Sequence, residues 1–336
     1  MERLWNRNYI KVMIANFMLY FAFYVLTPLL PIYLNEYFAA SKDTIGMVLS
    51  GYTVAALIIR PFSGYLVDSF DRKHILLIFF SLFAACFIGY FWAGTLLVFA
   101  IVRTLHGAPF GAVTVANSTC AIDVLPSSRR NEGIGYYGLS NNLGMAIAPS
   151  VGIFLYELTD SFDMIFILAL AIAGVGLAVD STLKLKPRPI NKTGRTVSLD
   201  RFFLPSSMHL GLTMFAAPWV FGRMAGLMLN AWPCLCMALG VLAAFLVQLF
   251  VRRRMGQRGI VSFAYLLIML ALCMLPVNSF AVVSVAYGLL GFGVGAVSSR
   301  HLMDWVVSAQ HCQRGTAQNT YILTWRMAFS LGFLFS

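Results

Sequence analysis

A few charged and polar side chains interrupt the long apolar stretches of this chain, and they are the residues best placed to do chemistry. Ionisable groups in such surroundings are costly to bury, so they commonly bind a solute, an ion or a proton. Arg103 and His106 stand three residues apart, and Arg326 lies in the last apolar stretch. We expect these cations to line a polar cavity, the alternative being structural packing or contact with lipid. The uncharged candidates for the same cavity are Asn16, Tyr20, Asn117, Asn141 and Asn142.

The residue pattern indicates neither a catalytic site nor a metal site. The six cysteines show no paired CxxC spacing, and no histidine stands at a metal-ligand interval. We therefore expect buried free thiols, no cofactor and no enzymatic activity. Proton coupling has one candidate, His106, whose imidazole can titrate near neutral pH, because no Asp or Glu falls in the middle of the first six apolar stretches. Protons accordingly remain a candidate coupling partner.

The elements that position these residues are apolar stretches of membrane-spanning length. Hydrophobic residues make up 60% of the 336 positions and charged residues only 11%, far below the roughly 25% of an average soluble domain. About 20 helical residues cross a hydrocarbon core of about 30 Å. The sequence therefore predicts an all-α polytopic membrane protein with about eleven spans: 9–34, 44–66, 74–92, 95–121, 133–156, 162–182, 203–222, 231–251, 260–277, 281–303 and 316–336.

The distribution of basic residues predicts the orientation. Cytoplasmic loops carry the excess of Lys and Arg, and six basic residues fall within 184–201 and four within 252–258, whereas the outer turns hold only Lys42 and Arg223. We predict a multi-pass protein of the inner or plasma membrane with a cytoplasmic N-terminus. The net charge of +11 thus reflects topology, and no nucleic-acid partner is expected.

The polar stretch 184–202 is rich in Pro, Gly and basic residues, as inter-domain linkers commonly are. It predicts a cytoplasmic linker between an N-terminal bundle, 1–183, with six spans and a C-terminal bundle, 203–336, with five. The twelfth span of a symmetric plan is missing from this prediction.

A repeat relates the two halves. A shift of 184 residues aligns one stretch with another without gaps, and parallel repeats of this kind occur in transporters whose two halves flank a binding site at the membrane midplane. We therefore expect two pseudo-symmetric six-helix bundles. The aligned pairs are Gly107 with Gly291, Gly111 with Gly295, Ala112 with Ala296, Val113 with Val297, Arg130 with Arg314, and Tyr137 with Tyr321.

Three motifs resemble those of the major facilitator superfamily. The segment 64–73, GYLVDSFDRK, resembles the family's loop signature G-x-L-x-D-r-x-G-R-K, with Asp71 at the position of the second glycine, where we expect a less tight turn. The segment 103–107, RTLHG, is similar to the R-x-x-x-G signature. Further along, Gly144, Pro149 and Gly152 resemble the motif of the drug:proton antiporter branch.

The resemblance implies a conformational latch at the inner surface. Its residues are Gly64, Asp68, Arg72, Lys73 and Asp123. Asp68 is expected to accept hydrogen bonds from the first amides of the last span, where unpaired N–H groups and the helix dipole favour an anion. Arg72 is expected to pair with Asp123. The 184-residue shift places Arg252 where Asp68 stands, so the latch is one-sided.

The resemblance also implies a function. We expect a monomeric secondary transporter in the lipid bilayer that moves a small organic solute by alternating access, in the direction of efflux. A proton-coupled nutrient uptake permease is one alternative. A truncated remnant or membrane receptor that transports nothing is another, because the twelfth span is absent from the prediction.

Overall fold

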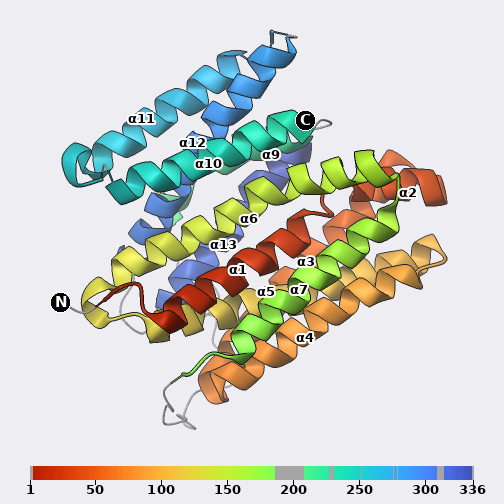
Figure 1. Cartoon of the computed structure of the whole chain (residues 1–336), viewed down its shortest axis with the longest axis horizontal. Helices are drawn as coiled ribbons and strands as arrows, with labels where there is room; N and C mark the ends of the chain where they lie inside the picture. The colour runs from red at the N-terminus through yellow and green to blue at the C-terminus, as the bar shows by residue number, and fades with distance from the viewer. Residues whose placement is uncertain are drawn as a thin grey trace. The chain divides into compact units, whose positions relative to one another are not determined.

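The computed structural model describes residues 3–185, 208–226, 231–250, 252–274, 276–277, 279–308 and 314–334. Within these ranges the chain forms thirteen α-helices and one short 3₁₀ helix, Ser127–Arg129, and no strand (Figure 1). The predicted all-helical class is confirmed.

Seven helices precede the linker. The first predicted span, 9–34, is divided in two, because Pro28 lacks a backbone N–H and disfavours helical geometry at the residue before it. The second piece begins with a proline in its first turn, where a missing N–H costs nothing. The helices are α1 (Arg7–Tyr24), α2 (Leu30–Phe38), α3 (Lys42–Ser69), α4 (Arg72–Phe91), α5 (Leu96–Val124), α6 (Arg130–Thr159) and α7 (Phe162–Ser181).

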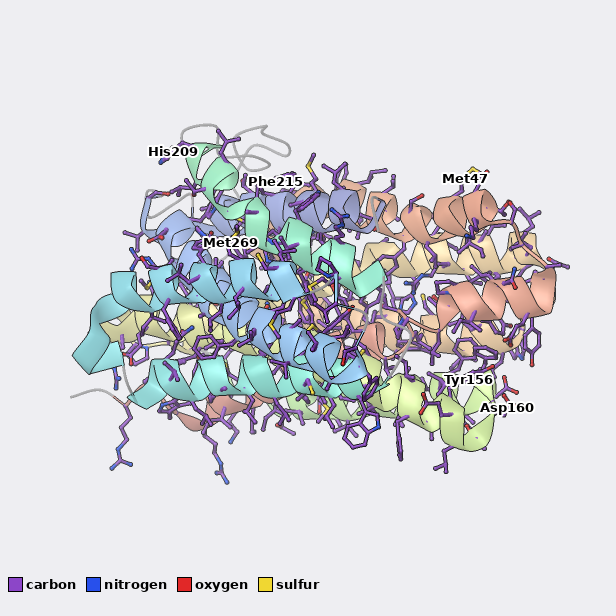
Figure 2. All side chains as sticks on the ribbon, turned by 90° about the horizontal axis from the view of Figure 1, so that it is seen from above. Met47, Tyr156, Asp160, His209, Phe215 and Met269 are labelled. Atoms are coloured by element: carbon purple, nitrogen blue, oxygen red, sulfur yellow. The ribbon has the colours of Figure 1, made fainter. Side chains whose placement is uncertain are left out.

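Six helices follow the linker. The described part of the predicted span 203–222, from residue 208 on, is divided into two short helices that meet at Phe215 (Figure 2). These helices are α8 (Met208–Met214), α9 (Ala216–Gly226), α10 (Ala231–Phe250), α11 (Arg252–Met274), α12 (Phe280–Ser308) and α13 (Arg314–Leu334).

Five of the described helical segments are long and apolar enough to cross a membrane. They are Lys42–Arg60, Arg72–Phe91, Leu96–Val124, Phe162–Ser181 and Phe280–Trp305. The total of eleven spans and the absent twelfth span stay predictions.

The chain divides into two compact units. The first comprises Met1–Gly133 and Gly152–Phe202, and the second comprises Ile134–Val151 and Phe203–Ser336. The middle of α6 therefore groups with the second unit although both its ends belong to the first. The predicted domains, 1–183 and 203–336, and their linker, 184–202, stay predictions, and most of the linker lies outside the described residues.

Each unit is a bundle of packed helices. In the first, α5 packs against α3 and α4, and α7 packs against α1 and α4 (Figure 1). In the second, α12 packs against α10 and α11, and α13 packs against α9.

Glycines permit close helix contacts, and two of these glycines stand at repeat-related positions. A Cβ atom added to Gly107 of α5 would lie 2.1 Å from the carbonyl oxygen of Tyr52 in α3. One added to Gly291 of α12 would lie 2.1 Å from the carbonyl oxygen of Met237 in α10. Because only glycine permits such backbone contact, the aligned residues perform the same packing task in both units.

The first turns of α1 tie together the ends of three other elements in the first unit. Asn6 Nδ2 donates to the Val124 carbonyl at the end of α5 (2.7 Å), and Tyr9 Oη donates to the Gly133 carbonyl in α6 (2.6 Å). Beyond α7, Lys11 Nζ donates to the Thr182 carbonyl (2.9 Å) and Asn8 Nδ2 to the Lys184 carbonyl (2.8 Å). The last carbonyls of a helix lack intrahelical donors, so these side chains supply donors at the end of α5 and just after α7.

Candidate functional site

Arg103 lies at the centre of a buried aromatic cluster in the first unit. It sits on the third turn of α5 and is 3% exposed. Its guanidinium lies 4.5 Å from the ring centroid of Tyr52 and 5.1 Å from that of Phe23, within cation–π range. Nη1 donates to Tyr90 Oη at 3.3 Å. Among the described residues no acidic side chain pairs with Arg103, so aromatic rings and a hydroxyl hold this cation.

His106 belongs to the same cluster, and its predicted place in a substrate cavity stays a prediction. Its Nδ1 lies 2.9 Å from Tyr90 Oη, and its ring packs against Phe83 and Phe87 with centroids 4.7 Å apart in both cases. The sequence analysis missed Tyr90, in the last turn of α4. The turn between α4 and α5 is only four residues long, and this hairpin was the signal that would have brought Tyr90 beside Arg103.

The predicted amides of α1 and α5 lie side by side. Asn117 Nδ2 is 3.5 Å from Asn16 Oδ1, and both side chains are fully buried. Tyr20, one turn after Asn16, packs its ring edge against Phe110 with centroids 5.6 Å apart. Buried polar side chains of α5 therefore lie at several positions in the interior of the first unit, namely Arg103, His106, Thr114 and Asn117.

The remaining cavity candidates lie in the second unit. Asn142 is 9% exposed and Asn141 is half-buried, both on the middle of α6, and Arg326 is half-buried on α13. The structure describes them within that unit, and their part in a cavity stays a prediction.

The antiporter-like motif lies on α6. Gly144, Pro149 and Gly152 are all buried. A Cβ atom on Gly152 would lie 2.3 Å from the Val25 carbonyl oxygen, just after α1 ends. Gly152 therefore allows α6 to contact the break between α1 and α2. The other end of this region carries Tyr156 and Asp160 at the terminus of α6 (Figure 2), where Tyr156 Oη donates to Glu36 Oε2 at 3.2 Å.

Two of the predicted latch residues form an ion pair. Arg72 contacts Asp123 through Nη1, and its Nε donates to the Val67 carbonyl at 3.2 Å, so the start of α4 is tied to the ends of α3 and α5. Lys73 is half-buried. A Cβ atom on Gly64 would meet no atom within 4 Å. The side chain of Asp68 lies outside the described residues.

Asp71, at the motif position where the family has glycine, caps α4. Its φ of −64° needs no glycine, and its carboxylate accepts the backbone N–H of His74 at 2.9 Å. That hydrogen bond lowers the pKa of Asp71 below its ordinary value, assisted by the His74 side chain. Asp71 therefore provides a helix N-cap at the position where the family motif has a flexible glycine.

Asp180 is a buried acid that the sequence analysis did not single out. It lies near the end of α7, is 0% exposed, and neither carboxylate oxygen has a hydrogen-bond partner among the described residues. Cys120 of α5 lies near it. Its place at the end of a predicted span, beside a basic linker, made it resemble a surface residue. Within the described chain no cluster of His, Cys, Asp and Glu is arranged to hold a metal ion.

The second unit contains a small cavity that the sequence analysis also missed. His301 of α12 lies on it and contacts Tyr265 Oη of α11 through Nε2 at 2.9 Å. The 184-residue shift aligns His301 with Asn117 of the first unit. This alignment with a predicted cavity residue could have identified His301 from the sequence. The lining residues are Met214, Ala217, Pro218, Val297, Ser298, His301, Tyr321 and Trp325.

A comparison with known families decides the relationship. The sequence profile of the Major Facilitator Superfamily matches residues 12–336. The chain belongs to the Major Facilitator Superfamily. The predicted resemblance is confirmed at this level.

Curated proteins that resemble the chain include one named for quinolone resistance and one named for staphylopine export. It is 25% identical over 221 residues to the quinolone resistance protein NorA of Staphylococcus aureus, which covers 62% of this chain and 57% of NorA. It is also 25% identical over 227 residues to the staphylopine export protein of the same species, covering 65% of this chain and 56% of that protein. The matched segment thus spans little more than half the length of these relatives.

Two solved structures share the superfamily fold. The human organic anion transporter MFSD10 superposes with a TM-score of 0.76 at 19% identity, over 98% of this chain and 92% of its own. The nucleoside transporter NupG gives a TM-score of 0.67 at 12% identity, over 98% and 90%. At these identities the likeness shows the fold alone.

Proposed function

We propose that this superfamily member is a secondary active transporter that exports a small, amphipathic organic solute across the inner or plasma membrane by alternating access. The observation that carries the direction of transport is the match to two proteins named for resistance and export. The buried polar groups of α5 and of the second-unit cavity support a solute with both apolar and polar parts, since such pockets are mostly apolar with a few polar groups.

Arg103 is the first-unit residue that we propose contacts the solute during the transport cycle. A buried cation without an acidic partner among the described residues costs free energy. Aromatic contacts offset part of that cost. A residue kept at such cost fits a functional role better than a packing role.

The inner surface of the first unit is where we place the conformational latch. The Arg72–Asp123 ion pair fixes the start of α4, and Asp68 on the last turn of α3 is proposed to bind the first amides of α13 in one state of the cycle. Replacing Asp68 with Asn removes the charge and keeps the shape. If this variant transports at the wild-type rate, the latch is wrong.

Protons are the coupling ion that we propose, with His106 and Asp180 as the groups that exchange them. Both are fully buried ionisable side chains of the first unit. Replacing Asp180 with Asn should leave solute movement down its own gradient intact and abolish its dependence on a pH gradient. Equal pH dependence in wild type and variant would remove Asp180 from the mechanism.

Flux measured in inside-out membrane vesicles tests the function directly. With the vesicle interior acidified and a fluorescent quinolone added outside, an exporter accumulates the compound, and dissipating the pH gradient stops accumulation. An uptake permease drives the compound out of preloaded vesicles instead. A receptor or an inactive remnant shows no flux above that of vesicles lacking the protein, and either result overturns the proposal.

A further inference from the structure

Tyr90 carries one hydroxyl group that contacts both ionisable residues of the buried cluster in the first unit. Its oxygen accepts a hydrogen bond from Arg103 Nη1 at 3.3 Å and lies 2.9 Å from His106 Nδ1. A guanidinium has donors and no acceptor, so the direction of the first bond is fixed. The second bond forms whichever partner supplies the hydrogen, because a hydroxyl can both donate and accept. One oxygen therefore joins the two residues.

Neighbouring rings fix the position of this oxygen. The side chain of Tyr90 is 1% exposed, and its ring stacks on Phe166 of α7 with centroids 5.3 Å apart. The ring of Phe99, in the first turn of α5, lies 5.1 Å from it. Because close-packed interiors leave such a ring little room to turn, the hydroxyl is the fixed member of the group of three.

The electrostatics of this arrangement change when His106 binds a proton. The two nitrogens share one oxygen at 2.9 and 3.3 Å, so they are no more than about 6 Å apart, and two unit charges at that distance repel each other in a low-dielectric interior. Arg103 is the charged group that acts on the imidazole, and no acid among the described residues pairs with it. The other titratable groups nearby, Tyr52 of α3 and Cys86 of α4, carry no charge to offset the repulsion.

Arg103 has one hydrogen bond among the described residues, and that bond goes to Tyr90. Its guanidinium also lies 4.5 Å from the ring centroid of Tyr52 in α3 and 5.1 Å from that of Phe23 in α1. Cation–π attraction continues to stabilise the cation when the hydrogen bond breaks. The hydroxyl of Tyr90 is therefore the contact that determines the direction in which the guanidinium points.

We propose that Tyr90 is the positioning residue that makes proton and solute exclude each other. With His106 neutral, the hydroxyl holds Arg103 in the orientation that contacts the solute. When the imidazole binds a proton, the repulsion between the two cations breaks the hydrogen bond from Arg103, and the solute loses its contact. The one covalent change is the N–H bond formed on the imidazole, and release of that proton on the other side of the membrane restores the first arrangement. This inference rests on the proposed function, because it explains how the two proposed groups act on each other.

Flux in inside-out vesicles that contain Tyr90→Phe tests the coupling. The substitution removes the oxygen and keeps the ring, so Arg103 loses its orientation and its link to His106. The measured quantity is the accumulation of the fluorescent quinolone under a pH gradient, divided by its flux without one. This ratio should fall at least about tenfold, the loss that one hydrogen bond to a charged group gives. A ratio equal to that of the wild type overturns the proposal.

Tyr9→Phe is the matched control. It removes another hydroxyl that is buried in the first unit and that donates to the Gly133 carbonyl at 2.6 Å. A general effect of losing a buried hydroxyl should lower the melting temperature of this variant while the ratio stays within about twofold of wild type. A loss of about tenfold in both variants would show a structural effect and overturn the assignment to Tyr90.

A His106→Gln background shows whether Tyr90 acts through the imidazole. Residues that act through one another give non-additive effects when both are replaced. In this background Tyr90→Phe should lower the ratio by less than about twofold, because the titrating group is already absent. A further loss as large as the one seen beside an intact His106 would mean that Tyr90 acts independently, which contradicts the proposal.

An NMR measurement on the purified chain needs no transport. With ¹⁵N-labelled arginine, the Arg103 resonances are assigned by their loss in Arg103→Met. They should shift as His106 titrates, and the shift should be at least about threefold smaller in Tyr90→Phe, because the hydrogen-bonded link is gone. No shift in the wild type, or a shift of equal size in the variant, overturns the inference. A chain with this coupling and no flux overturns the transport function alone, whereas flux whose pH dependence survives Tyr90→Phe overturns only this inference.

Discussion

The two units use the same helix contact and surround it with different chemistry. Gly107 and Gly291 bring α5 against α3 and α12 against α10 at equal distance from a carbonyl oxygen. Yet the 184-residue shift places Tyr287 where the first unit has Arg103. The Tyr287 hydroxyl donates to the Met224 carbonyl at 2.8 Å, an ordinary satisfied hydrogen bond, whereas Arg103 is a cation held by aromatic rings.

The difference continues along the same helices. Thr114 and Asn117 of α5 correspond to Ser298 and His301 of α12. Asn117 lies beside an amide of α1, whereas His301 contacts Tyr265 and lines a cavity. The backbone packing is therefore the same in the two units, while the polar side chains at the aligned positions make different contacts. The lesson is that a repeat predicts where helices touch better than it predicts what they bind.

The largest loss of stability should come from disrupting the glycine contact that the two units share. Gly107→Ala and Gly291→Ala each place a Cβ atom 2.1 Å from a carbonyl oxygen, and forced overpacking of this kind costs about 3 kcal/mol. Thermal unfolding in detergent measures the loss. Gly174→Ala of α7 is the control, because its Cβ would meet nothing within 4 Å, and it should be neutral or slightly stabilising. Tolerance at Gly291 alone would break the equivalence of the two units.

The second effect contrasts the aligned positions Arg103 and Tyr287. Arg103→Met removes a buried cation that has no acidic partner among the described residues, so stability should change by less than about 1 kcal/mol while flux falls at least about tenfold. Tyr287→Phe leaves the Met224 carbonyl without its donor and should cost about 1–2 kcal/mol, with flux per folded molecule within about twofold of wild type. Equal flux in the two variants would contradict the division of tasks.

A third effect concerns the ion pair between Arg72 and Asp123 of the first unit. The 184-residue shift places Gly256 and Val307 at the aligned positions, so the second unit has no such pair there. Arg72 and Asp123 are 13% and 32% exposed, so their pairing is partly screened. A double-mutant cycle with Arg72→Gln and Asp123→Asn should give a coupling free energy of about 1 kcal/mol in chemical denaturation. A coupling near zero would mean that the pair orders the loop without stabilising it.

The smallest effect is the pH dependence of the α4 cap. The pKa of Asp71 is lowered in the folded chain because its carboxylate accepts the His74 N–H. Its contribution is therefore present above the pKa of the unfolded chain and is lost as pH falls through the lower folded value. Asp71→Asn keeps the cap acceptor without the titration, so its melting temperature should fall less than that of wild type between pH 5 and pH 3. Identical slopes would contradict the role of this carboxylate.

The sequence predicted the helical elements well because their apolar stretches are long and are bounded by caps and charges. It missed the breaks at Pro28 and Phe215, where short-range geometry overrides an unbroken apolar pattern. Arg103, His106 and the Arg72–Asp123 pair were predictable since they stand in motifs. Tyr90, Asp180 and the His301 cavity were not, because each gains its surroundings from a different helix. The proposed roles of Asp68 and Arg326 stay predictions.

The bonds from α1 to Val124, Gly133, Thr182 and Lys184 have a consequence for biosynthesis. The first helix leaves the ribosome before any of its acceptors exist, and two of the four carbonyls appear only when α7 is complete. The first turns of α1 can therefore bind Val124 and Gly133 before α7 is made, whereas their bonds to Thr182 and Lys184 must form later. The full set of bonds at this end of α1 is consequently completed only after the last helix of the first unit has been synthesised.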